Sequence, residues 1–119
     1  MKKTIEAEFK REKMAKKNLF ETERFFLDVY GLEPGQSQSP HAHEGCDKVY
    51  VVLEGSGTIK VGGEVHAVTG GDAVHAPAGV EHALENLGPR RMVALAFMAP
   101  HPSPKKRNEP PNTRVTPKD

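Results

Sequence analysis

Three histidines of the chain stand where they could bind one metal ion together. His41 and His43 are separated by a single residue, so on a β-strand both side chains would point to the same face. Two imidazoles on one inward face are costly to leave without partners, and neutral imidazole is a good ligand for zinc, iron, nickel and copper. A His-x-His pair in a solvated loop would need no metal, so the pair becomes informative only together with a third histidine, His82.

His82 follows a run of turn-forming residues in the segment "GDAVHAPAGVEHALEN". Pro77 and Gly79 shape a tight turn between two short strands. His82 would then lie on the strand after this turn, where it could face the first two histidines across a sheet. A lone histidine is usually a core or surface residue, so the prediction of a metal site depends on all three.

Together, the two segments resemble the paired motifs of the cupin superfamily. The first motif begins here with Gly35, five further residues and the His41-x-His43 pair. The second motif has the form G(x)5PxG(x)2H(x)3N. The chain matches it at every specified position, with Gly71, Pro77, Gly79, His82 and Asn86. The resemblance covers about residues 25–98. It implies an all-β fold, the double-stranded β-helix or jelly-roll barrel.

The resemblance also implies a cofactor, a divalent transition metal ion (Zn, Fe, Ni, Mn or Cu) bound once per chain. Its protein ligands would be His41, His43 and His82, together with the acidic residue of the first motif. Such an ion would keep open coordination positions, which distinguish a working metal site from a closed structural one.

The acidic ligand is the point at which the chain departs from the motif. Counting back from Gly55, the glutamate position falls on Lys48, which cannot bind a metal while it is charged. Counting forward from the histidine pair, the acidic position falls on Asp47. On a continuous strand its side chain would point to the same face as His41 and His43, although a turn between them could break this alternation. Three arrangements remain open. The histidines bind the ion with Asp47; or they bind it with water, and Lys48 turns outward or pairs with Glu44 or Asp47; or no metal binds, and Lys48 holds an anionic ligand inside the barrel.

Two side chains are candidates for substrate binding. Lys48, if it points inward, would orient a substrate carboxylate. His75 could line the mouth of the barrel, although an exposed position is the more common outcome for such a residue. Asp47 would act as a fourth metal ligand or as a nearby base.

A metal ion held by three neutral histidines can act as a Lewis acid, activate water or bind dioxygen. From the resemblance we expect a mononuclear metal-dependent enzyme that acts on a small oxygenated metabolite, with oxygenase, isomerase, lyase or decarboxylase chemistry. The alternative is a non-catalytic cupin that binds or senses a small molecule, because candidates for a general base are few. The fold does not decide between these functions.

The segments that must position these side chains have the pattern of short strands. Turn signals recur at roughly 8–12-residue spacing, which is typical of an all-β sandwich or barrel. Strands are predicted near residues 18–22 and 24–32, through the histidine pair, and across "KVYVVLEG", which is apolar enough to be a central strand. A hairpin at Gly62-Gly63 and two final strands, in "EHALENLG" and "RMVALAFMA", complete the series.

Composition divides the chain of 119 residues into three parts. Residues 1–17 are predicted to be an arm or strand, residues 18–99 the cupin barrel, and residues 100–119, which are rich in proline, a disordered tail. We expect a homodimer, because small cupins commonly pair, and a strand at 3–10 could be the exchanged element.

Several classes of protein are disfavoured. The net charge is +1 and tryptophan is absent, so no nucleic-acid partner is expected. No apolar run approaches the roughly 20 residues of a membrane span. The single cysteine, Cys46, favours a reducing compartment, and "MKKTIEAEFKREKMAKK" lacks the apolar segment of a secretory signal. We therefore expect a cytoplasmic protein that binds a small-molecule ligand.

Overall fold

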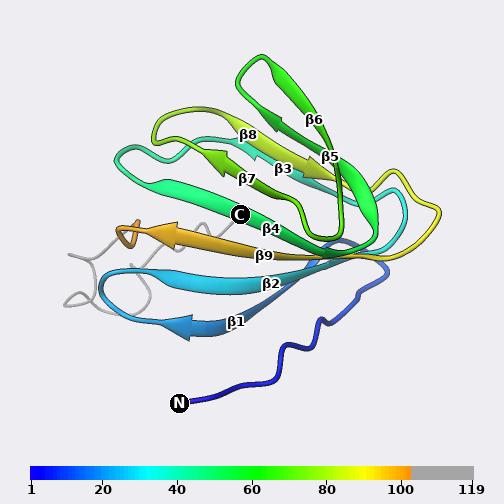
Figure 1. Cartoon of the computed structure of the whole chain (residues 1–119), viewed down its shortest axis with the longest axis horizontal. Helices are drawn as coiled ribbons and strands as arrows, with labels where there is room; N and C mark the ends of the chain where they lie inside the picture. Colours follow the sequence, from blue (N-terminus) through cyan, green and yellow to red (C-terminus); the bar gives the residue numbers. More distant parts are fainter. Residues whose placement is uncertain (103–119) are drawn as a thin grey trace.

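The computed structural model describes residues 1–102, which form two antiparallel β-sheets (Figure 1). One sheet has five strands in the order β1-β2-β9-β4-β7, and the other has four in the order β3-β8-β5-β6. The strands are β1 (Ala15–Glu21), β2 (Phe26–Leu32), β3 (Ser37–His41), β4 (Asp47–Glu54), β5 (Ser56–Val61), β6 (Glu64–Thr69), β7 (Ala73–Ala76), β8 (His82–Glu85) and β9 (Met92–Ala99). The predicted all-β jelly roll is confirmed.

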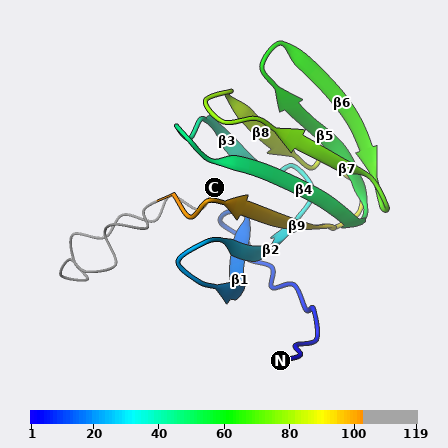
Figure 2. The same ribbon diagram turned by 60° about the vertical axis from the view of Figure 1, so that its left-hand side comes forward.

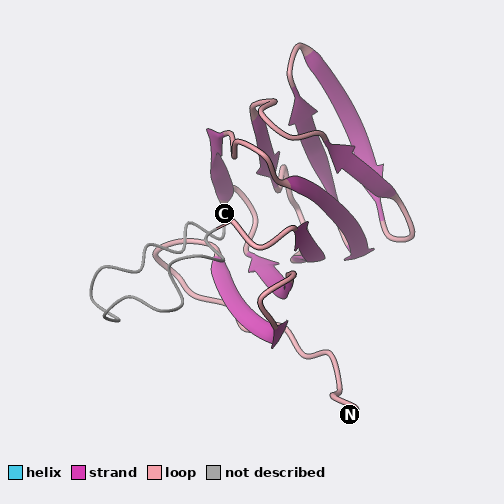
Figure 3. Cartoon of the chain, turned by 90° about the vertical axis from the view of Figure 1, so that its left-hand side faces the viewer, coloured by secondary structure: helices cyan, strands magenta, loops and turns pink. Residues whose placement is uncertain are grey.

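Strands and loops alone make up residues 1–102 (Figure 3). Within this described range, no helix has the length and apolarity that a membrane span requires. The predicted hairpin at Gly62-Gly63 joins β5 to β6, and the predicted central strand is β4, which lies between β9 and β7.

The interior lies between the two sheets and is filled from both. In β4, Lys48, Tyr50 and Val52 are buried, whereas the alternate residues Val49 and Val51 are only partly buried. This period of two arises because successive side chains of a strand point to opposite faces. The main apolar cluster includes Tyr30, Leu32, Tyr50, Val52, Ile59, Val68, Leu84 and Met92. Each large apolar side chain buried in this way stabilises the fold by about 1.5–3 kcal/mol.

The N-terminal arm, residues 1–14, lies against the outer side of the five-stranded sheet. It extends beyond β1 on the side away from β3, β5, β6 and β8 (Figure 2). A Cβ atom at Gly31 of β2 would come within 1.9 Å of the Glu8 carbonyl oxygen, so the arm crosses the strand where a side chain is missing. Phe9 packs against a cluster that includes Leu19 and Val29. The arm is therefore part of the packed structure of the sheet.

Two predictions for the chain ends differ from the structure. The strand predicted at 18–22 begins earlier, at Ala15, and residues 1–10 form no strand in the single chain. His101, from the predicted tail, is buried, with its ring 5.7 Å from that of Phe26 and its Nε2 atom 2.5 Å from Glu21 Oε2. The rest of the predicted tail, residues 103–119, lies outside the described residues.

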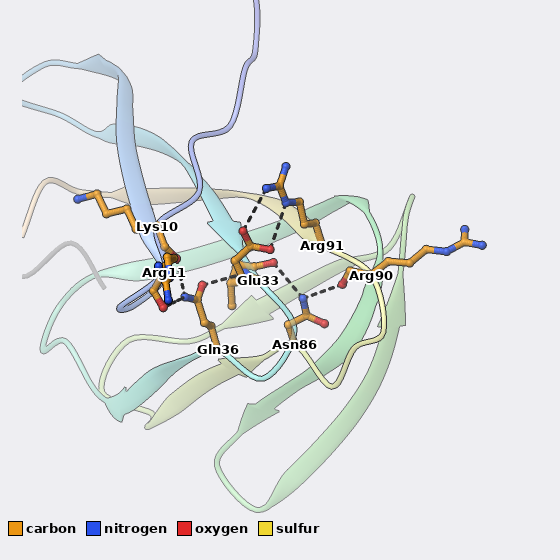
Figure 4. A network of polar contacts seen from close by, with 8 residues as sticks. Lys10, Arg11, Glu33, Gln36, Asn86, Arg90 and Arg91 are labelled. Carbon is orange, nitrogen blue, oxygen red and sulfur yellow. Dashed lines mark hydrogen bonds and ion pairs between the residues drawn. The ribbon is translucent and has the colours of Figure 1, made fainter.

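A polar network fixes one end of the barrel (Figure 4). The buried Asn86 donates from Nδ2 to the carbonyl oxygens of Leu32 and Arg90, at 3.0 and 2.9 Å, and its Oδ1 accepts from the Gly88 amide at 2.7 Å. Gln36 donates to the carbonyl oxygen of Lys10 at 2.7 Å and so ties the arm to the same end. Asn86 follows β8 directly, so the network holds in place the strand that begins with His82.

Candidate metal centre

The structure brings His41, His43 and His82 together as one cluster, here called the histidine group. One ring nitrogen from each lies within 4.8 Å of those of the other two. His41 ends β3 and is the cross-strand partner of His82, which begins β8. The ring centroids of this pair are 4.4 Å apart, and that of His43 is 4.9 Å from His41 and 6.0 Å from His82.

Backbone contacts orient two of these rings. Nδ1 of His41 lies 2.8 Å from the Ser39 carbonyl oxygen, and Nδ1 of His82 lies 3.1 Å from that of Val80. A carbonyl oxygen only accepts hydrogen bonds, so Nδ1 is the donor in each ring. In the neutral tautomer, Nε2 then presents its lone pair, which is the arrangement commonly found in metal-binding histidines.

His43 is held by the turn of the second motif. The strand predicted through both histidines ends at His41, so His43 lies in the loop after β3. Its carbonyl oxygen accepts a 2.8 Å hydrogen bond from the amide of Gly79. Gly79 has a φ of 78°, a conformation that favours glycine. The turn of the second motif therefore positions both His82 and the loop that carries His43.

The buried position of His82 favours its neutral form. Burial lowers its pKa to about 4, and the nearby charge of Lys48 contributes to the lowering. Among the described residues, no hydrogen-bond partner reaches its buried Nε2 atom. A buried polar atom without a partner is costly, and a metal ion would satisfy this nitrogen. The three side chains thus fit a divalent transition metal that prefers imidazole, such as zinc, iron, nickel or copper.

Asp47 is not part of the histidine group. The first residue of β4, it is exposed, and its Oδ1 atom accepts hydrogen bonds from His75 Nε2 and from the Ala78 amide, both at 3.1 Å. The hydrogen bond from His75, followed by that from Ala78, lowers the pKa of this carboxyl. The parity argument fails because a turn, with Gly45 at a φ of 73°, separates β3 from β4.

His75 lies on the outside of the barrel. Its side chain is 56% exposed, and β4 and β7 pair it with Val49, which is itself on the outer face of β4. The structure therefore places His75 and Asp47 side by side on the outer surface, and neither belongs to the histidine group.

Lys48 points into the barrel. The residue is 1% exposed, and its Nζ atom lies 4.9 Å from the centroid of the Tyr50 ring and 5.3 Å from that of Tyr30. Both contacts are close enough for cation–π attraction. The ring of Tyr50 is in turn 5.9 Å from the ring of His82. An ammonium group thus lies inside the barrel, on the sheet opposite the strands of His41 and His82.

Gln38 of β3 is an interior polar residue that neither motif indicates. It accepts a hydrogen bond from the Tyr50 hydroxyl and donates one to Tyr30 Oη at 3.2 Å. These bonds connect the two sheets and fix both rings beside Lys48. In the sequence, Gln38 lies just before the strand predicted through the histidine pair, and its residue type alone did not mark it as part of the site. Alternation along the strand could not predict which way the Gln38 side chain points relative to that of His41, because the register of β3 shifts between the two residues.

Known proteins share this architecture. The family model described as "Cupin domain" matches residues 28–98. An uncharacterized protein of Streptomyces coelicolor is 37% identical over 76 residues, which cover 62% of this chain and 70% of that protein. The tetracenomycin polyketide synthase protein TcmJ of Streptomyces glaucescens is 35% identical over 80 residues, which cover 65% of this chain and 54% of that protein.

Solved structures agree with the sequence matches. The crystal structure of TT1209 from Thermus thermophilus has a TM-score of 0.76 and 43% identity, covering 78% of this chain and 89% of that one. A predicted oxalate decarboxylase from Thermotoga maritima has a TM-score of 0.67 and 27% identity, covering 72% and 77%. The family match spans all three members of the histidine group and the strands that position them. The chain therefore belongs to the cupin family.

Proposed function

We propose that this protein is a mononuclear metal-dependent enzyme in which the histidine group holds one divalent transition metal ion. The observation that carries the proposal is the buried Nε2 atom of His82, in a group whose three ligand nitrogens all lie within 4.8 Å of one another. When bound, the ion would act as a Lewis acid toward an oxygen atom of the substrate.

The residues of this chain supply the rest of the site. The carbonyl oxygen of Ser39 accepts the Nδ1 proton of His41, and that of Val80 accepts the Nδ1 proton of His82. The Nε2 atom of each ring is then left to bind the ion. Lys48 and the tyrosine rings beside it form the wall opposite His82. The substrate we propose is a small oxygenated metabolite. Two similar proteins, a polyketide synthase protein and a predicted oxalate decarboxylase, are named for oxygen-rich compounds of this kind.

A non-catalytic binding or sensor module is the second candidate. It is favoured by the donor set, because among the described residues no carboxylate or thiol joins the three histidines. The one carboxylate predicted to do so, that of Asp47, faces outward. A site with no carboxylate beside the ion has fewer means of moving a proton during a reaction.

Metal analysis tests the proposal. The protein purified without added metal, or reconstituted with zinc, iron, nickel or copper, is expected to hold about one equivalent, and His82→Ala about a tenth of that or less. His75→Ala is the matched control and should retain the ion, because His75 lies on the outer surface. Wild-type protein that binds no transition metal after reconstitution would overturn the metal site.

Turnover separates the two candidates. The loaded protein would be incubated with a panel of small carboxylates and diketones, and substrate loss would be followed by NMR. Product formation that disappears in His82→Ala supports the enzyme. Saturable binding of a panel member without turnover supports the binding module instead.

A further inference from the structure

Within the described part of the chain, the outer face of the five-stranded sheet is covered over only one half. On the half formed by β1 and β2 lies the arm, residues 1–14, whose Phe9 packs against the cluster that contains Val29. On the other half, formed by β9, β4 and β7, Phe97 and Leu53 are each 38% exposed. This second half is here called the bare strip. The face thus consists of a ridge, the arm, beside an open surface.

The bare strip is apolar along β4 and β9. Its outward-facing residues there are hydrophobic, and each is exposed or partly buried: Val49, Val51, Leu53, Leu95 and Phe97. The rings of Phe97 and Phe25 lie 5.5 Å apart and continue this surface beyond β9. A monomeric protein in water rarely exposes a contiguous apolar surface, and such surfaces commonly mark a contact with another protein. The strip therefore has the character of a docking surface.

At one end of the sheet, a basic residue of the arm is level with an acidic residue of the bare strip. Lys3 Nζ lies 5.1 Å from the centroid of the Phe20 ring. Successive strand pairings across β1, β2, β9 and β4 place Phe20 level with Val49. Val49 is two residues from Asp47, an exposed carboxylate at the start of β4. Lys3 and Asp47 thus lie at nearly the same level along the strands, on opposite halves of the face.

The other end of the sheet repeats this relation. The Glu8 carbonyl oxygen crosses Gly31, which the strand pairings place level with Glu54 at the end of β4. Two exposed basic residues, Lys10 and Arg11, follow in the arm. The arm as a whole carries five basic residues and three acidic ones. The ridge is therefore net basic, whereas the bare strip has an acidic residue at each end.

A two-fold axis parallel to the strands would keep these levels and exchange the two halves of the face. We propose that two copies of this chain pack face to face about such an axis, so that the arm of each copy lies on the bare strip of the other. Lys10 then approaches Glu54 of the partner subunit, and Lys3 approaches Asp47 of the partner subunit. The arm stays on its own sheet, so this dimer exchanges no strand. Complementary charges at both ends fix the register of the two faces.

The available area suits an association of moderate strength. With strands about 4.8 Å apart and a rise of about 3.4 Å per residue, the bare strip measures roughly 14 by 20 Å. The dimer has two such contacts, which bury on the order of 1,200 Å² when both surfaces of each are counted. This value is at the lower end for stable protein interfaces, so we expect the dimer to dissociate on dilution.

Sedimentation velocity of the full chain, over about a hundredfold range of concentration, tests the proposal. Wild type is expected to be a dimer at the upper end of the range. Val51→Lys, in the middle of the strip, should weaken association at least about a hundredfold, because each dimer would bury two added ammonium groups. Val65→Lys is the matched control. Val65 is 60% exposed on β6 of the other sheet, so this variant should associate like wild type.

A charge exchange tests the direction of the axis and changes only exposed residues. Lys10→Glu and Glu54→Lys should each weaken association about tenfold, because like charges would meet twice in every dimer. Both substitutions in one chain should restore it. Lys10→Glu combined with Asp47→Lys is the control and should remain weak, because these residues lie at opposite ends of the sheet.

The outcomes decide the proposal without reference to the metal, because every measurement uses metal-free protein. A wild-type protein that is monomeric at every concentration overturns the dimer. Val51→Lys that is folded by circular dichroism and dimerises as tightly as wild type overturns the bare strip as the interface. Recovery with Asp47→Lys in place of Glu54→Lys would put the axis across the strands and overturn the proposed arrangement. The proposed function stands or fails separately, on metal content and turnover.

Discussion

Acidification of the metal-free protein is expected to destabilise it through His82. Burial lowers the pKa of His82 from 6.5 to about 4 in the folded chain, and the charge of Lys48 contributes. In the unfolded chain the imidazole takes up its proton near 6.5, so between these values the unfolded state binds more protons than the folded state. The contribution is therefore fully present above 6.5 and is lost as the pH falls toward 4.

The size of the effect follows from the same two values. One pKa unit corresponds to about 1.4 kcal/mol, so the interval from 6.5 to about 4 amounts to at most about 3–4 kcal/mol of unfolding free energy. The assay is urea unfolding at a series of pH values after removal of metal with a chelator. His82→Gln is expected to remove most of the pH dependence that wild type shows in this interval.

His66→Gln serves as the control, because His66 is a partly exposed residue of β6 and should leave the wild-type pH dependence in place. The reasoning is refuted if wild type and His82→Gln lose the same free energy across this interval. That result would mean that His82 is not kept neutral by the barrel interior, and the argument for a preformed metal ligand would lose its support.

Three further predictions concern the fold around the site. Gly31→Ala is expected to cost about 1–3 kcal/mol, because the new Cβ would lie 1.9 Å from the Glu8 carbonyl oxygen; thermal unfolding measures it, and an unchanged midpoint would contradict the close crossing. Asn86→Ala should cost about 2–4 kcal/mol in urea unfolding, because two carbonyl groups and one amide lose their partner. Glu33→Gln breaks only an exposed ion pair with Arg91 and should cost less than about 1 kcal/mol of unfolding free energy. A larger loss in Glu33→Gln than in Asn86→Ala would contradict the expectation that the buried amide contributes more than the exposed ion pair.

The parts of the site that could be predicted from the sequence are those fixed by local geometry. Gly79 adopts a φ of 78° in the turn before β8, and the cross-strand pairing of His41 with His82 follows once both motifs lie on neighbouring strands. Glycine, proline and histidine at fixed spacing carry this information directly. The fold and the histidine group are therefore predictable from the sequence.

The orientation of Asp47 and Lys48, the two candidates for the motif's acidic position, could not be predicted in the same way. Strand parity extends only as far as the strand, and the turn with Gly45 separates β3 from β4. The phase of β4 is set by its own pairing with β7 and β9, which turns Lys48 inward and Asp47 outward. This pairing is a property of the assembled sheet, so counting along the chain gave two candidates and could not choose between them.

The N-terminal arm shows the same limit. Its few apolar residues suggested a strand at 3–10, yet Phe9 packs on the outer side of the sheet without strand pairing. The signal for this packing is Gly31, which leaves room for the Glu8 carbonyl oxygen. A glycine within a strand indicates a close approach, but it does not say which segment makes it.

The place of the histidine group at a sheet edge has a mechanical consequence. β3 is an edge strand whose neighbour is β8, and their pairing is irregular between Gln38 and His41. An ion held by the three histidines would act as a cross-link that joins this edge to the next strand and to the loop of His43. Metal loss should then loosen the edge locally, and hydrogen exchange of the β3 amides would report occupancy without any knowledge of the ligand. An ion bound there would thus also set how firmly this edge strand is held to the barrel.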